Sequence, residues 1–542
     1  MGKTSCAARY PDPPPEAPRR AGCSCAIRAV RPCDTAEMTA SQPGQQPAPG
    51  FDEATKSRLI ETNGIDIISE SERTAQPRDL FWPWFAANVS VFGMGYAAFI
   101  YGFGVSFWQA LVVALIGIPI SFVLCGIIAI AGKRGSVPTM VLSRAAFGVH
   151  GQKLPGIVSW LLSIGWETFL AIMAVLATAT VFDRLGIGGG ATTKIIAAVA
   201  VAALIVIASV LGYHTIMKLQ SVLTWITGAI TIVYMLLTVS HIDWAAVQAI
   251  PSGSVGQLLG ALTMVMTGFG LGWINIAADW SRYQHRDASN GSIVLWNTLG
   301  GSVAPVILVT FGLLLAGSDP ALSEGIASDP IGTLATILPI WVLIPFWITA
   351  VLALVSGAVL GIYSSGLTLL SLGIRIPRPA AAAIDGVILT IGTIWVVFFA
   401  ENFLGPFQSF LLILGVPMAS WAGILIADIV TRKRPYDELA LFEPTGRYQA
   451  FDWVSIGTLV VATIIGWGLV INQFAGDAPW ANWQGYLLEP LGLGTRTVVD
   501  GVEAWDGVWP WANLGVLLAL VLSFAVTLIA RRGTIARQEE RA

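Results

Sequence analysis

The stretch Gly268-Phe269-Gly270-Leu271-Gly272-Trp273-Ile274-Asn275 lies in an apolar run near 257–277. It holds three glycines and one asparagine, although glycine costs a helix about 1 kcal/mol relative to alanine. Irregular backbone inside a membrane is tolerated only where it is buried in protein or lines a cavity. The stretch therefore predicts a membrane helix that breaks beside a solute-sized cavity.

A second stretch has the same character. Trp84-Phe85-Ala86-Ala87-Asn88-Val89-Ser90-Val91-Phe92-Gly93-Met94-Gly95 lies in the run near 82–105. These two runs are the first and the sixth along the chain, so two five-helix units would start on opposite sides of the membrane. Secondary transporters combine such inverted repeats with paired discontinuous helices. For either helix alone the glycines could equally serve close helix packing, but their equivalent places in both halves favour a binding site.

The composition indicates that the whole chain is built for a membrane. Of its 542 residues 55% are hydrophobic and 12% charged, whereas soluble domains carry about 25% charged residues. A helix crosses the bilayer with about 20 mainly apolar residues. Twelve such runs are present, near 82–105, 107–131, 155–181, 192–212, 216–239, 257–277, 292–317, 339–371, 382–400, 403–430, 453–472 and 510–530.

The distribution of basic residues predicts the orientation of these helices. With both termini in the cytoplasm, only Arg184, Lys194 and Arg496 of the 30 Lys and Arg lie outside, as the positive-inside rule requires. The predicted fold is therefore an all-α protein of the cytoplasmic membrane with twelve transmembrane helices, the first and sixth discontinuous. Its expected parts are a disordered cytoplasmic tail (1–80), a transporter core (81–430) of two repeats (81–239 and 257–430), two further helices (431–530) and a cytoplasmic C-terminal tail (531–542). Met1 and Met38 are alternative start sites.

Other function classes find little support in the sequence. An intramembrane enzyme would need clustered His, Asp or Glu at membrane depth, but His150, His214, His241 and His285 all lie at expected helix ends or in loops. No glycine-rich phosphate loop follows a strand, which argues against ATP-driven transport. A channel would need a continuous polar lining, whereas these helices carry isolated polar residues. A membrane sensor stays open as an alternative.

Three segments resemble a known family. Gly272-Trp273 followed by Ala277-Ala278-Asp279-Trp280-Ser281-Arg282-Tyr283 resembles a signature of the purine–cytosine permeases, in the nucleobase–cation symporter-1 family. Tyr363-Ser364-Ser365-Gly366-Leu367 and Trp82-Pro83-Trp84-Phe85-Ala86-Ala87-Asn88 are similar to its helices 8 and 1. The resemblance covers about residues 65–470. It implies a LeuT-type fold of two inverted five-helix repeats plus two helices, and cation-coupled uptake of nucleobases or related ring compounds bound between helices 1, 3, 6 and 8.

The resemblance also implies an aromatic clamp for a planar ring. Trp166 occupies the place of the stacking tryptophan on helix 3, although a packing role is the plain alternative among 21 tryptophans. Phe269 matches the second wall and Trp273 is the alternative wall. Gly270 and Gly272 supply the unwound backbone between them. Stacking on an aromatic ring is worth roughly 1–3 kcal/mol per base.

Glu167 is the acid near the middle of helix 3. A charge at the bilayer centre costs about 2.5–3.5 kcal/mol or more, so such residues usually face a cavity and serve a function. Ser159, Ser163 and Glu167 recur every four residues and share one helix face. Glu167 is expected to accept a ring N–H of the substrate or to bind a coupling proton; a structural hydrogen bond is the alternative.

The remaining candidate residues are amides and oxygen ligands. Asn88 and Asn275 offer donors and acceptors to a base edge, or cap the broken helix ends. Ser356, with carbonyls near Ala87 and Ser90, is the candidate site for a coupling Na⁺. No metal site or cofactor is expected apart from the coupling cation, H⁺ or Na⁺. The expected partners are a small-molecule substrate and the lipid bilayer, with no nucleic acid and no obligate protein partner.

Two positions depart from the family pattern. Leu170 stands where relatives often carry an amide, and Ser356-Gly357-Ala358-Val359-Leu360-Gly361 replaces an asparagine cluster on helix 8. Either Glu167 takes over these hydrogen bonds or the substrate is not cytosine. The predicted function is cation-coupled uptake of a nucleobase such as cytosine or a purine by alternating access. The alternative is the same transport of allantoin, a hydantoin or a ring vitamin.

Overall fold

The computed structural model of the protein describes residues 64–209, 213–399, 404–472, 483–499 and 502–540. Its first five-helix unit comprises α2 (Phe81–Asn88) and α3 (Phe92–Tyr101), then α4 (Phe107–Gly135), α7 (Lys153–Arg184), α8 (Ala191–Ser209) and α9 (Tyr213–Thr238). The second comprises α11 (Val255–Gly268) and α12 (Gly270–Trp273), then α13 (Asn290–Ser318), α16 (Leu343–Ser371), α17 (Arg378–Phe399) and α18 (Leu404–Thr431). Helices α19 (Trp453–Trp467), α20 (Leu514–Ala530) and α21 (Arg532–Glu540) follow.

These helices account for all twelve expected spans. Within the described residues, nine helices are long and apolar enough to cross a membrane. Two bent pairs of helices pass the same test together, Pro77–Asn88 with Phe92–Tyr101 and Leu514–Ala530 with Arg532–Glu540. The shorter apolar helix α19 completes the set.

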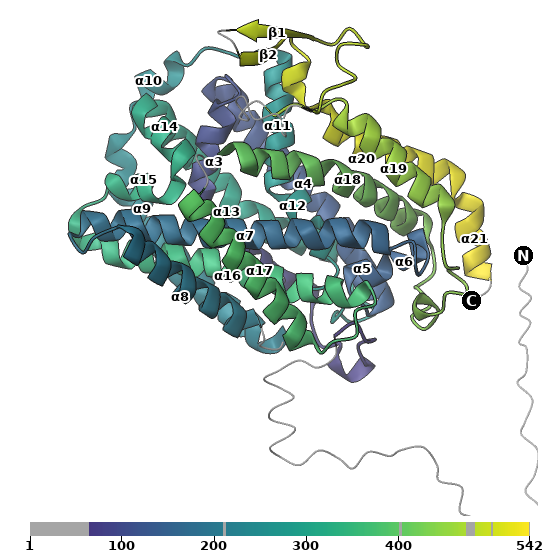
Figure 1. Cartoon of the computed structure of the whole chain (residues 1–542). Helices are drawn as coiled ribbons and strands as arrows, with labels where there is room; N and C mark the ends of the chain where they lie inside the picture. The colour runs from purple at the N-terminus through teal and green to yellow at the C-terminus, as the bar shows by residue number, and fades with distance from the viewer. Residues whose placement is uncertain (1–63, 210–212, 400–403, 473–482, 500–501, 541–542) are drawn as a thin grey trace, which may run out of the picture. The chain divides into compact units, whose positions relative to one another are not determined.

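The two five-helix units pack through equivalent members. The third helix of one unit, α7, packs most extensively against the third helix of the other, α16, and the second helices α4 and α13 pair in the same way. Figure 1 shows α7 and α16 running through the middle of the molecule. Gly357 and Gly361 stand one turn apart on the face of α16 that meets α7, so the two backbones approach closely.

The expectation of a disordered tail over 1–80 is wrong for residues 64–80. The backbone N–H of Ile68 donates to Ser136 O at 3.0 Å, and Ala75 pairs with Gln284 as an isolated bridge. The Arg73 side chain is buried and donates to Lys133 O at 2.7 Å. Residues 64–80, a segment of mixed polarity, are thus ordered by backbone hydrogen bonds to distant residues. The hydropathy of the segment does not predict such bonds. Residues 1–63 lie outside the described residues.

Several connecting segments also contain helices and strands that the sequence did not predict. The segments between spans hold the short helices α5 (Thr139–Leu142), α6 (Arg144–Phe147), α10 (Trp244–Ala249), α14 (Pro320–Ser328) and α15 (Pro330–Thr336). Strands β1 (Thr495–Val499) and β2 (Val502–Asp506) form an antiparallel hairpin before α20. Within the expected C-terminal tail over 531–542, residues 532–540 form the short helix α21, which buries Ile535 and Gln538.

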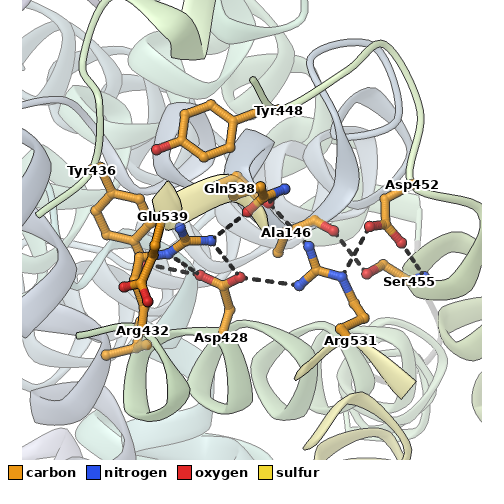
Figure 2. Close-up of polar contacts among 12 residues, drawn as sticks. Ala146, Asp428, Arg432, Tyr436, Tyr448, Asp452, Ser455, Arg531, Gln538 and Glu539 are labelled. Carbon is orange, nitrogen blue, oxygen red and sulfur yellow. Dashed lines mark hydrogen bonds and ion pairs between the residues drawn. The ribbon is translucent and has the colours of Figure 1, made fainter. Parts of the chain in front are cut away.

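A buried ionic network joins the C-terminal helices to the core (Figure 2). Asp428 Oδ1, near the end of α18, lies 3.0 Å from Arg432 Nη2 and 3.0 Å from Arg531 Nη1. Arg531 also pairs with Asp452, the residue that caps α19, at 3.0 Å. Gln538 of α21 accepts a hydrogen bond from Arg432 at 2.7 Å. One carboxylate therefore compensates two buried guanidinium groups from different segments.

Candidate functional site

The break in the sixth span falls at Phe269, whose backbone angles are φ −112° and ψ −110°. The groups freed there find partners on other helices. Gly270 N–H donates to Ser121 Oγ of α4 at 3.0 Å, and Tyr96 of α3 donates its hydroxyl to Gly268 O at 3.0 Å. An unpaired backbone group costs several kcal/mol in a membrane, so Ser121 and Tyr96 stabilise the unwound form.

The break in the first span lies between Asn88 and Phe92, where the helix bends by 67°. Asn88 Nδ2 donates to Trp84 O at 2.8 Å, and Phe92 N–H donates to Ser90 Oγ at 3.3 Å. In this conformation the Asn88 side chain therefore bonds back to its own helix. Both discontinuous helices predicted from the glycine-rich stretches are thus present.

A cavity lies where the broken sixth span meets α7 and α16. Its lining comprises Ser163, Trp166, Glu167, Leu170, Gly272, Trp273, Asn275, Ile276, Gly357 and Gly361. It encloses about 10 Å³, which is about the room for one water molecule. Pockets that bury drug-sized ligands hold about 300–1,000 Å³. The structure therefore shows the site closed, and a ring compound would enter only after α7, α12 or α16 moves.

Three polar atoms at this cavity have no hydrogen-bond partner. They are Nε1 of Trp166 and both carboxyl oxygens of Glu167. Buried polar atoms are nearly always paired in folded proteins, so an exception calls for an explanation such as a ligand or an unseen water. A donor and a carboxyl group thus face the same small space without partners in the protein.

Trp166 lies against the backbone of the broken helix. A Cβ at position 272 would stand 3.3 Å from Trp166 Nε1 and 2.8 Å from Thr267 O, so only glycine fits there. On its other sides the indole meets Phe169 and Phe407 edge to face, with ring centroids 5.6 and 5.5 Å away. This packing fixes the ring plane beside the cavity.

Glu167 fits because position 361 is a glycine. A Cβ there would lie 2.8 Å from Glu167 Cγ and 3.0 Å from its Oε1. The other members of the predicted helix face turn toward the sixth span. Asn275 Nδ2 donates to Ser159 Oγ at 2.9 Å and to Ser163 Oγ at 3.0 Å. Ser163 and Glu167 of this face line the cavity, whereas Ser159 does not and instead bonds to Asn275.

The chain matches a known family over most of its length. Residues 67–486 match the family described as permeases for cytosine/purines, uracil, thiamine and allantoin. The chain belongs to this permease family. Over 443 residues the permease is 25% identical to a putative purine-cytosine permease, YxlA of Bacillus subtilis (strain 168), covering 78% of this chain and 93% of YxlA.

Solved structures support the fold. The permease resembles Mhp1, a nucleobase-cation-symport-1 family transporter in a closed conformation with bromovinylhydantoin bound, at a TM-score of 0.65 and 18% identity, over 90% of this chain and 100% of Mhp1. It also resembles an outward-open Na⁺-coupled sialic acid symporter at a TM-score of 0.55 and 11% identity, over 87% and 93% of the two chains. The predicted membership of the nucleobase–cation symporter-1 family and the LeuT-type inverted repeat are confirmed. The permease is a multi-pass membrane transporter.

The structure does not bring every predicted site residue to the cavity. Trp166, Glu167, Gly272, Trp273 and Asn275 line it, whereas Phe269, Gly270 and Asn88 do not. Phe269 packs on Tyr96 with a centroid distance of 4.4 Å. In this closed form the alternative wall, Trp273, therefore occupies the place expected of Phe269.

The predicted ion ligands are only partly assembled in the closed permease. A Cβ at position 357 would lie 3.9 Å from Ala87 O, so α16 does approach the first break. However, Ser356 donates its hydroxyl to Gln220 of α9, and Gln220 Nε2 donates back to Ser356 O at 3.0 Å. The assignment of Ala87, Ser90 and Ser356 to Na⁺ stays a prediction.

Some residues that support the site escaped the sequence reasoning. Gln220 is fully buried on an otherwise half-exposed helix, and Ser121 pairs with the broken sixth span. Ser121 stands alone in an apolar run, which is a weak signal that could have marked it, whereas Gln220 lies in the mixed stretch Lys218-Leu219-Gln220-Ser221. Their partners lie on other helices, so one sequence alone does not reveal what they bind.

Proposed function

We propose that the permease takes up a nucleobase such as cytosine or a purine together with H⁺ or Na⁺, by alternating access across the cytoplasmic membrane. In this proposal both termini are cytoplasmic, as the distribution of Lys and Arg favours. The observation that carries the proposal is the group of unpaired polar atoms on Trp166 and Glu167 beside a broken helix. A planar ring with N–H and C=O groups would satisfy them.

The proposed binding mode follows from the chemistry of the lining. In an opened site, the indoles of Trp166 and Trp273 would offer faces to a planar ring. Glu167 would accept a ring N–H as a carboxylate or hold a proton. Asn275 would add an amide at the base edge, at the expense of one serine contact. Each stacking contact contributes roughly 1–3 kcal/mol.

The membrane potential is sufficient to drive such uptake. One positive charge entering down about 100 mV releases about 2.3 kcal/mol. Because about 1.36 kcal/mol corresponds to a tenfold ratio, one cation supports an accumulation of about 50-fold. A single proton or sodium ion per substrate molecule would therefore be sufficient for concentrative uptake without ATP.

The second candidate function is transport of a related ring compound such as allantoin, a hydantoin or a ring vitamin. It is favoured by Leu170, which stands where the resemblance led us to expect an amide, and by Gly357 and Gly361, which belong to the stretch that replaces an asparagine cluster on helix 8. All three residues line the cavity. Fewer side chains can then form hydrogen bonds with the edge of the substrate ring, and Glu167 contributes most of the polar recognition of the substrate. A sensor that binds without transport is a further alternative.

The two candidates are separated by competition for uptake. Proteoliposomes with an imposed ion gradient take up labelled cytosine while purines, pyrimidines, hydantoins and ring vitamins compete. We expect a purine or pyrimidine to compete best. Best competition by allantoin or a hydantoin would favour the second candidate. Binding of a panel compound without accumulation under either a H⁺ or a Na⁺ gradient would favour a sensor and contradict transport.

Removing the proposed stacking ring tests the binding mode. Trp166→Ala is expected to raise KM by about 5- to 150-fold, which corresponds to the roughly 1–3 kcal/mol of a stacking contact. The protein should still insert, because the lost indole borders a cavity. Trp395→Ala, at a 60% exposed position on α17, is the matched control and should leave KM unchanged. An unchanged KM for Trp166→Ala would remove Trp166 from the site.

A further inference from the structure

A second buried acid lies near Glu167 on a different helix. Asp385 of α17 is fully buried between α7 and α16. Its Oδ1 accepts a hydrogen bond from Trp160 Nε1 at 2.9 Å, and its Oδ2 accepts one from Ser365 Oγ at 2.7 Å. Among the described residues, no Lys, Arg or His forms an ion pair with Asp385 or with Glu167.

Ser365 stands between the two acids. Glu167 contacts α16 at Gly361, and Ser365 follows one helical turn later, about 6 Å along the axis. Gly361 and Ser365 therefore share one face of α16, and Ser365 is bonded to Asp385. In the closed form neither Glu167 oxygen makes a hydrogen bond. A rotatable hydroxyl that is bonded to Asp385 thus stands one helical turn from the residue that the unpaired Glu167 carboxyl contacts.

Few other charges face this pair. The charged residue closest along α17 is Arg378, two turns before Asp385, and its guanidinium lies over the Tyr363 ring at 4.3 Å and donates to Ser209 O at 2.8 Å. Helix α16 carries no acid or base. Two further arginines reach α16 from other elements: Arg282 donates to the Tyr363 hydroxyl at 3.0 Å, and Arg144 donates to Ser371 O at 2.9 Å. The other charges on or beside the elements that pack against α7, α16 and α17 include Lys194, Lys218, Asp279, Asp329 and Asp428.

We propose that Glu167, Ser365 and Asp385 share one exchangeable proton and that this proton is the coupling ion. The proposal rests on the proposed function as a cation-coupled transporter and selects H⁺ as the cation. The physical reason is that two neighbouring carboxylates in an apolar site cannot both be ionised without a large cost. With no cation paired to either acid, one retained proton offsets that cost.

The transfer between the acids balances in one concerted step. The proton on Glu167 bonds to Ser365 Oγ while the original hydroxyl proton of Ser365 moves to Asp385 Oδ2. One O–H bond breaks and one forms at each transfer, and the negative charge passes from Asp385 to Glu167. Glu167 is then a carboxylate that accepts a ring N–H. Trp160, which bonds to Asp385, precedes Glu167 by about two turns of α7, so the transfer moves the proton toward the Lys153 end of that helix.

The central test replaces Asp385 with asparagine, which keeps its size and removes its charge. Proteoliposomes receive whichever of cytosine, hypoxanthine, uracil and allantoin the wild type concentrates best, and an internal dye reports proton entry. For Asp385→Asn, exchange of labelled for unlabelled substrate should persist, because Asp385 does not line the cavity and Glu167 can ionise once no neighbouring carboxylate repels its charge. Substrate-driven proton entry should fall by about tenfold or more, and accumulation should be lost.

Two further variants make the result decisive. Thr390→Val, on the same helix and bonded only to Gly386 O of its own helix, should behave as wild type. Ser365→Ala keeps both acids, removes the bridging hydroxyl and should slow proton entry about tenfold. If Asp385→Asn does not fold, the rate of proton entry in Ser365→Ala tests the proposal in its place.

The outcomes distinguish a failure of the shared-proton proposal from a failure of the proposed function. Proton entry at the wild-type rate in Asp385→Asn would overturn the proposal that Glu167, Ser365 and Asp385 share the coupling proton. If Asp385→Asn does not fold, wild-type proton entry in Ser365→Ala would overturn it. Wild-type accumulation driven by Na⁺ without proton entry would also overturn it, while leaving transport intact. Failure of the wild type to exchange any of the four compounds would overturn the proposed function itself.

Discussion

Proteoliposomes that contain Glu167→Gln are expected to lose concentrative uptake. Glutamine keeps the shape that fits against Gly361 but carries no exchangeable carboxyl proton and cannot become an anion. If Glu167 holds the coupling proton, accumulation should fall from about 50-fold at about 100 mV to no accumulation. The measurement is the internal-to-external ratio of labelled substrate under an imposed gradient.

The result for Glu167→Gln also distinguishes its two candidate roles. Lost accumulation with normal exchange assigns Glu167 to coupling, whereas a raised KM in exchange assigns it to the contact with the ring N–H. Glu324→Gln, at an exposed position on α14, is the matched control and should accumulate substrate normally. Normal accumulation by Glu167→Gln would restrict Glu167 to a structural role.

The largest expected loss of stability follows from Asp428→Ala. This change leaves Arg432 and Arg531 buried, at 2% and 0% side-chain exposure, without the carboxylate that both contact. Removing one partner of a buried ion pair typically costs about 3–5 kcal/mol. Because the network joins α18, α19 and α21 (Figure 2), the loss should appear as a lower free energy of unfolding in detergent.

The control for this experiment is a partly exposed ion pair. Asp437→Ala removes the partner of Arg447, with an N–O distance of 3.3 Å and 37% exposure of the aspartate side chain. A surface pair is worth about 0–1 kcal/mol, and the hydrogen bond that Asp437 Oδ1 accepts from Ala440 N–H at 3.1 Å is worth about 1 kcal/mol. This variant should therefore lose clearly less stability than Asp428→Ala. Equal stability of the two variants would show that the network around Asp428 does not hold the C-terminal helices in place.

The membrane spans could be predicted from the sequence because their signal is local. A run of about 20 apolar residues crosses a bilayer whatever its neighbours are. The breaks were also local, since glycine and asparagine gather at Asn88–Gly95 and Gly268–Asn275. Segments whose order comes from distant partners were missed. Residues 64–80 pair with Ser136 and Gln284, and no periodicity within that segment indicates those contacts.

The sequence could not predict how each helix is rotated about its axis, and therefore which of its side chains face the cavity. Near a break the rule of about 100° per residue fails, so the sequence could not decide whether Phe269 or Trp273 faces the cavity. For Ser356 the sequence suggested an ion ligand, but α9 supplies Gln220 to the same hydroxyl. The sequence did not identify Asp385 as a candidate residue, because its position relative to Glu167 depends on how α17 packs on α7 and α16.

The central claim is that two broken spans enclose a binding site for a ring compound beside Trp166 and Glu167. Its most direct test is a structure of the permease with the best competitor from the panel bound. We expect the ring to lie between Trp166 and Trp273, with an N–H directed at Glu167, while both spans stay broken. A compound bound elsewhere, or two continuously wound spans with side chains filling the cavity, would contradict the claim.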